Sequence, residues 1–138
     1  MVSLIIGNKG SGKTKHLIDE VYKAYEASNG HVICVEKNRK LTYDITSGVR
    51  LVSADDYAVA GYEAYYGFLA GMCASDHDLT DVLGDGTLKI GGTDTEQLAD
   101  FLEKVNNLGD AAGTKFTFTI SADESELPAK IFDYCEKI

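Results

Sequence analysis

The residues of this sequence that are best suited to chemistry lie near its start, in the stretch GNKGSGKT (7–14). Its three glycines permit positive φ angles and let the backbone approach a bulky anion. Consecutive backbone N–H groups can then surround a phosphate, helped by the positive N-terminal end of a following helix. Lys13 can reach the β and γ phosphates of a nucleotide, and Thr14 can offer its hydroxyl to Mg²⁺. The stretch therefore predicts a site for a nucleoside triphosphate.

The surroundings of this loop support the prediction. The spacing matches G-x-x-x-x-G-K-[ST] in full, after the apolar strand pattern VSLII (2–6) and at the start of a helical pattern. On these residues the chain resembles the P-loop NTPase superfamily. The resemblance covers residues 1–121 and implies the following ligand-binding residues: Asn8, Lys9, Gly10, Ser11, Gly12, Lys13, Thr14 and Lys15. The alternative is a glycine-rich turn that carries a surface lysine.

A second acidic residue is expected at the end of a buried strand, because P-loop proteins hold Mg²⁺ with one. Asp85, which closes the strand pattern LTDVLGD (79–85), resembles this Walker B aspartate, so Thr14 and Asp85 are the predicted metal ligands. Gly84 departs from the bulky apolar residue that usually precedes it. The alternative is an Asp-Gly hairpin turn, with TLKI (87–90) as the returning strand.

The residue that would orient the attacking water is harder to place. A large branch of the superfamily has a glutamate directly after the metal-binding aspartate, whereas this chain has Gly86. Glu36, at the end of the strand pattern HVICVE (31–36), is a replacement, and with Lys13 it completes the predicted catalytic pair. Secretion and pilus-retraction ATPases of the PilT type have a comparable acidic segment, to which VICVEK bears a faint similarity. The alternative is that Glu36 is a solvated surface residue.

Two further segments at the same edge are candidates for phosphate contacts. KNRK (37–40) is a cationic patch, and Arg39 or Lys40 could contact phosphate in the same chain or in a neighbouring subunit. Ser121 ends another strand, where related proteins often place a polar residue that senses the γ-phosphate. The alternative for the cationic patch is an ordinary charged surface loop.

The elements that must position these residues alternate along the chain. Strands are predicted at 2–6, 31–36, 49–53, 79–85 and 115–121, and helices at 13–28, 54–74, 93–108 and 125–137. This order predicts an α/β fold with a mainly parallel sheet of about five strands, the third of them at an edge. The resemblance implies a three-layer P-loop sandwich of RecA-like order, with strand 115–121 between strands 2–6 and 79–85. Ligands would bind at the carboxyl ends of the strands.

Composition restricts the classes of partner. A chain of 138 residues is expected to form one domain, and its net charge of −9 disfavours nucleic acid and anionic membranes. The longest weakly charged run, 57–74, contains Glu63 and is predicted to be a buried helix and not a membrane span. No membrane insertion is therefore expected. The number of cysteines is odd, and Cys34, Cys73 and Cys135 show no disulfide pattern. They are therefore expected to be buried free thiols, which is typical of a cytoplasmic protein. The histidines lack metal-ligand spacing.

The leading functional hypothesis is binding of Mg²⁺ and a nucleoside triphosphate, with slow hydrolysis by water. ATP is the default because it is common, since no guanine-recognition signature is present. The alternative is a nucleotide-binding regulatory or structural module that does not hydrolyse its ligand. A small-molecule kinase is a third hypothesis, disfavoured by the two arginines and the absence of a segment for a lid. Whether a protein partner or a homo-oligomer is involved stays open.

Overall fold

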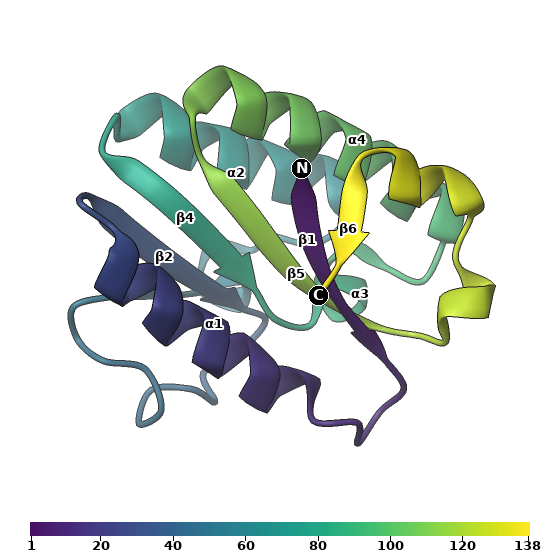
Figure 1. Ribbon diagram of the computed structural model, residues 1–138, viewed down its shortest axis with the longest axis horizontal. Coiled ribbons are helices and arrows are strands. Elements are labelled where there is room, and N and C mark those ends of the chain that lie inside the picture. Colours follow the sequence, from purple (N-terminus) through teal and green to yellow (C-terminus); the bar gives the residue numbers. More distant parts are fainter.

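Every residue from 1 to 138 is described by the computed structural model, whose centre is one parallel sheet of six strands (Figure 1). The strands are β1 (Val2–Gly7), β2 (His31–Glu36), β3 (Arg50–Ser53), β4 (Leu79–Gly84), β5 (Lys115–Ser121) and β6 (Cys135–Lys137). Their order across the sheet is β3-β2-β4-β5-β1-β6. Strand β3 is at an edge, as predicted, and β5 lies between the strand that precedes the glycine loop and the strand that precedes Asp85.

Helices cover both faces of this sheet, which gives a three-layer α/β arrangement (Figure 1). One face carries α1 (Lys13–Ala27), and the other carries α2 (Tyr62–Ser75) and α4 (Thr95–Ala112). A short helix, α3 (Thr87–Gly91), follows β4. None of the helices combines the length and apolarity that crossing a bilayer requires.

The sheet separates two apolar clusters. The larger one, of 24 buried residues, fills the space under α2 and α4. At its centre the ring of Tyr65 stacks on Phe101 and meets Phe118 edge-on, so this tyrosine of α2 serves core packing. The smaller cluster, of nine buried residues, joins α1 to the sheet and includes Leu41, from the segment between β2 and β3. That long segment is thereby anchored beside the glycine loop's helix.

The cysteines are buried free thiols, as predicted. Desolvation by burial is the main reason why the pKa of the Cys34 thiol rises to about 12, with the negative charge of Glu36 adding to the rise. A thiol of this kind stays protonated and unreactive at neutral pH. It therefore contributes to packing rather than to chemistry.

The prediction of a final helix over 125–137 is wrong. This segment contains two 3₁₀ turns (Glu124–Glu126 and Ala129–Asp133) and then the edge strand β6. Pro128 holds Leu127 in an extended conformation, with ψ of 138°, because the residue before a proline is disfavoured in the helical region. The chain then pairs with the free edge of β1, and Ile138 donates a backbone hydrogen bond of 2.9 Å to Leu4.

Two other predicted helices have different boundaries. The stretch 54–74 begins as a 3₁₀ turn (Ala54–Tyr57), and α2 starts only after Gly61, whose φ is 88°. Helix α4 is capped by Asp94, which accepts hydrogen bonds from the first turn, and continues past Gly109 to the C-cap Gly113. Gly109 is needed inside the helix because a Cβ there would lie 2.7 Å from the Thr114 carbonyl oxygen.

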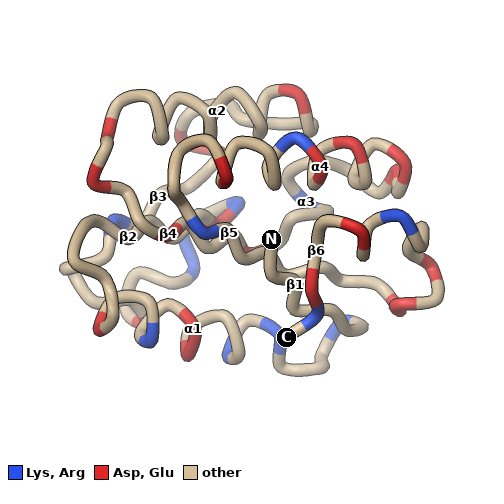
Figure 2. Tube along the Cα trace, turned by 45° about the horizontal axis from the view of Figure 1, so that its top comes forward, with Lys and Arg blue, Asp and Glu red and all other residues tan.

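Charge is distributed unevenly over the fold. Acidic residues recur along α4 and in the segment that leads to β6 (Figure 2). In contrast, the first 18 residues contain three lysines and no acidic side chain. The glycine loop is therefore locally basic in a protein whose net charge is −9, which favours an anionic ligand at this position.

Candidate functional site

The glycine loop has a folded backbone that connects β1 to α1. Gly10 and Gly12 have φ angles of 84° and 83°, a region that favours glycine. The Ser11 N–H donates to the Asn8 carbonyl over 3.1 Å, and the Lys13 ammonium donates to the same oxygen over 3.0 Å. Three of the predicted binding residues thus converge on one turn, and Lys13 folds back over the loop.

Helix α1 begins without a side-chain cap. Its N-cap is Gly12, no side chain accepts a hydrogen bond from its first turn, and that turn contains no acidic residue. Most helices satisfy some of these N–H groups with a Ser, Thr, Asp or Asn side chain. The helical hydrogen bonds start with the His16 N–H, which donates to the Gly12 carbonyl over 3.1 Å. The start of α1 is therefore suited to accept an external anion.

Thr14 and Asp85 lie in direct contact although 71 residues separate them. The Thr14 hydroxyl donates to Asp85 Oδ2 over 3.1 Å and lies 3.4 Å from Oδ1. The Asp85 backbone N–H donates to the Val35 carbonyl over 2.8 Å, which ties the residue to β2. The two predicted metal ligands are thus brought together at the carboxyl edge of the sheet.

Thr119 also belongs to this group, although it is not among the residues predicted from the sequence. Its side chain is 1% exposed, and its hydroxyl donates to Asp85 Oδ1 over 2.7 Å. The same hydroxyl accepts the Gly86 N–H over 3.0 Å. The alternation of KFTFTIS places Thr119 on the same face as Ser121, and this was the available signal. Ser121 itself is exposed and pairs through its backbone with Gly7.

The glycine before Asp85 has a packing explanation. A Cβ at Gly84 would lie 2.5 Å from the Tyr65 hydroxyl oxygen and 2.9 Å from Phe118 Cδ1. A bulky residue cannot occupy this position, because the aromatic cluster already fills the space. The alternative of an Asp-Gly hairpin is wrong, because residues 87–91 form α3 and the neighbours of β4 are parallel strands.

Glu36 is buried, so its interpretation as a solvated surface residue is wrong. The residue is 4% exposed, and Oε1 accepts the Lys40 N–H over 2.8 Å and the Leu41 N–H over 3.2 Å. Burial raises the pKa of the Glu36 carboxyl above its ordinary value, and the negative charge of Asp85 adds to the rise. The two backbone N–H donors and the positive charge of Lys40 lower this pKa and oppose the shift.

Glu36, Thr14 and Asp85 line one cavity of about 190 Å³ at the carboxyl edge of the sheet. Lys40 and Lys89 also line it. Within the cationic patch 37–40, Lys37 pairs with Asp55 over 2.9 Å and Arg39 pairs with Asp56 over 2.7 Å. Arg39 does not line this cavity; it lines a neighbouring hollow beside β3. Lys37 and Lys40 of the patch therefore both line the cavity, and Lys37 does so while paired with Asp55.

The donor set at this cavity fits Mg²⁺ better than a transition metal. No cluster of three or more His, Cys, Asp or Glu side chains capable of holding a metal occurs in the protein. The pair Thr14 and Asp85 offers hydroxyl and carboxylate oxygens, the hard ligands that Mg²⁺ prefers. Because Mg²⁺ usually takes one or two protein ligands and completes its shell with phosphate oxygens and water, two such residues suffice.

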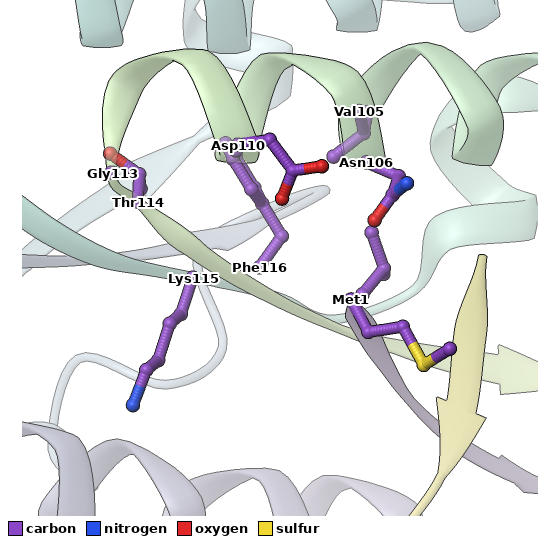
Figure 3. A pocket seen from close by; sticks show the side chains of 10 residues that line it. Met1, Val105, Asn106, Asp110, Gly113, Thr114, Lys115 and Phe116 are labelled. Atoms are coloured by element: carbon purple, nitrogen blue, oxygen red, sulfur yellow. The ribbon is translucent and has the colours of Figure 1, made fainter.

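Another hollow, of about 320 Å³, lies at the opposite ends of the strands (Figure 3). Asp110 and Asn106 of α4 point toward it, and Lys115 extends away from α4. The buried polar atoms without a hydrogen-bond partner, Tyr65 Oη and Thr87 Oγ1, are not among its lining residues. Ligands of parallel sheets bind at the carboxyl ends of the strands, so the cavity at Asp85 is the stronger candidate.

No protein-family model and no curated protein matches this chain.

Proposed function

We propose that this protein binds a nucleoside triphosphate together with Mg²⁺ at the carboxyl edge of its sheet. The observation that carries the proposal is the contact of Thr14 with Asp85, directly beside the uncapped start of α1. A phosphate-binding helix terminus and a pair of hard oxygen ligands are the two parts that P-loop proteins combine. ATP is the first nucleotide to test.

The order of the strands supports a RecA-like member of the P-loop NTPases. In that arrangement one strand separates the strand of the glycine loop from the strand of the metal-binding aspartate, and β5 has this position here. Bound Mg²⁺ would neutralise charge that develops on the phosphates. The residues of this chain would hold the nucleotide: backbone N–H groups of 8–15 around the phosphates, Lys13 on their oxygens, and Thr14 with Asp85 at the metal.

Glu36 supports hydrolysis as part of this function. Its carboxylate is buried at the end of β2, the strand beside β4, and it lines the same cavity as Asp85. From that position it can accept a hydrogen bond from a water that attacks the terminal phosphate. Gly86, directly after Asp85, offers no side chain for this task.

The second candidate function is a nucleotide-binding module that does not hydrolyse its ligand. The observation that favours it is the set of hydrogen bonds that Glu36 accepts from Lys40 and Leu41. These bonds hold the turn after β2, so Glu36 has a structural task even without a water to orient. Steady-state release of phosphate by the purified protein separates the two candidates.

The binding proposal is tested by thermal unfolding with and without nucleotide. Mg²⁺ with ATP should raise the melting temperature of the wild type, since a ligand that binds only the native state stabilises it by about 2.7 kcal/mol at 100 times its Kd. Lys13→Ala should abolish the shift, because it removes the cation that contacts the phosphates. Differential scanning fluorimetry with ATP, GTP, CTP and UTP measures this directly.

The control for this experiment is Lys115→Ala, which removes an exposed lysine at the opposite ends of the strands. It should keep the full shift. Failure of every nucleotide to stabilise the wild type would contradict the proposal, as would an undiminished shift in Lys13→Ala.

A further inference from the structure

Lys40 and Lys89 reach the same cavity from two different segments. The cavity of about 190 Å³ is lined on one side by Thr14 and Asp85, where the proposed function places metal and phosphate. Lys40 comes from the turn after β2, and Lys89 comes from α3. The sequence predicts Lys40 as one of two candidate phosphate contacts, whereas its pattern assigns no role to Lys89.

Neither of these two lysines forms an ion pair, in contrast to Lys37 and Arg39 of the cationic patch. The seven ion pairs of the protein include Lys37 with Asp55 and Arg39 with Asp56, but none involves Lys40 or Lys89. In an acidic protein, lysines without carboxylate partners at a concave site are available to an anion. The two carboxylates at the cavity, Asp85 and Glu36, hydrogen-bond to a hydroxyl and to backbone N–H groups instead.

The backbone of each lysine is held in place. The Lys40 N–H donates to the buried Glu36 carboxylate over 2.8 Å, and the next residue, Leu41, is 6% exposed. The Lys89 N–H donates to the Gly86 carbonyl over 2.9 Å. The Gly86 N–H in turn donates to the Thr119 hydroxyl oxygen. Both side chains therefore start from fixed points at the rim of the cavity, which lowers the entropic cost of using them in binding.

We infer that Lys40 and Lys89 form a cationic pair that contacts the terminal phosphate of the bound nucleotide, so that the site prefers a triphosphate to a diphosphate. This inference rests on the proposed function. In the proposed binding mode a diphosphate would end at the glycine loop and Lys13, whereas a third phosphate would carry additional negative charge toward the cavity beyond Thr14. The pair would then act within one chain, in the role that an arginine from a neighbouring subunit serves elsewhere.

The test compares affinities for two nucleotides that differ at the terminal phosphate. Isothermal titration calorimetry in excess Mg²⁺ should measure binding of the non-hydrolysable β,γ-imido analogue of ATP and of ADP. For Lys40→Ala and for Lys89→Ala we expect about a tenfold loss of affinity for the triphosphate analogue, typical of a charged hydrogen bond, and less than a twofold loss for ADP. Lys115→Ala should bind both nucleotides like the wild type.

The outcomes separate this inference from the proposed function. If the wild type binds neither nucleotide, the proposed function fails and the inference fails with it. If the wild type binds both and Lys13→Ala binds neither, while both lysine variants keep the wild-type ratio of affinities, the inference alone is overturned. An equal loss of affinity for both nucleotides also overturns the inference, because the lysines would then not discriminate the terminal phosphate. Unchanged melting temperatures of the ligand-free variants exclude misfolding as the cause.

Discussion

At the scale of single residues, the Glu36 carboxylate has an observed structural role and a proposed chemical one. It closes the turn after β2 by accepting the Lys40 N–H, and it also lines the cavity beside Asp85. Gln can accept the same backbone hydrogen bond but cannot act as a base. A single substitution, Glu36→Gln, therefore separates the structural task from the chemical one.

We expect Glu36→Gln to remove phosphate release while nucleotide binding is kept. The turn stays closed, so the binding residues keep their positions, but no carboxylate remains to accept a proton from water. A coupled phosphate-release assay and the melting shift with Mg²⁺ and ATP measure the two properties. Turnover that equals the wild-type rate would show that Glu36 takes no part in the reaction, and release below detection in the wild type itself would favour the non-hydrolysing module.

The same variant should change how stability depends on pH. The raised pKa of Glu36 means that the native protein holds this proton more tightly than the unfolded chain, whose carboxyl titrates near 4.5. Unfolding therefore releases a proton, and the free energy of unfolding of the wild type falls as pH rises from about 4.5 through the native pKa. Relative to Glu36→Gln, the wild type should lose stability across this range and stay level above it, as urea denaturation at several pH values would show.

At the scale of the elements, β4 and α2 determine where Asp85 lies. The last residue of β4, Gly84, faces the Tyr65 hydroxyl and the Phe118 ring, and this close approach requires the absence of a side chain. The Tyr65 hydroxyl is fully buried and has no hydrogen-bond partner. Burial is also the main cause of its raised pKa. At the contact of Gly84 with Tyr65 there is therefore no room for a Cβ atom, and the Tyr65 hydroxyl has no hydrogen-bond partner.

We predict that Gly84→Ala destabilises the protein by about 1–3 kcal/mol, the usual cost of overpacking a filled core. The double variant with Tyr65→Phe should recover part of this loss, because removing the hydroxyl removes the nearest clash. Tyr65→Phe alone should leave the stability equal or higher, since no hydrogen bond is lost. Denaturation in urea gives the double-mutant cycle, and additive effects of the two substitutions would contradict the predicted contact.

At the scale of the whole molecule, the C-terminal segment is part of the core rather than an appendage. Ile131 is fully buried in the larger cluster and Cys135 is 2% exposed. Strand β6 pairs with β1, the strand that leads into the glycine loop. The segment thus supports β1, and with it the glycine loop, from the edge of the sheet opposite β3.

Ile131→Ala should therefore lower the free energy of unfolding by about 2–5 kcal/mol, as expected for a large-to-small change in a closed core. The matched control is Ile138→Ala, in the same segment, where the side chain is 42% exposed and the cost should stay below about 1 kcal/mol. Equal costs for the two substitutions would show that the segment does not belong to the core.

Much of the fold could be predicted because its signals are local. Apolar runs such as VSLII define buried strands, and the spacing of Tyr62, Tyr65 and Leu69 defines the buried side of α2. The predictions failed where a local signal competed with a tertiary one. The segment 125–137 has a helical pattern, but Pro128 and the free edge of β1 give it 3₁₀ turns and a strand.

The sequence by itself determined the loop GNKGSGKT and, through its spacing, the residues proposed to hold a phosphate. Only the tertiary structure decided which distant residues join them. Thr14 meets Asp85 because the strand order brings their segments to one edge, and the same folding buries Glu36 and places Thr119 behind Asp85. The physical reason is that backbone conformation follows from neighbouring residues, whereas burial and pairing depend on contacts across the sheet that local sequence does not encode.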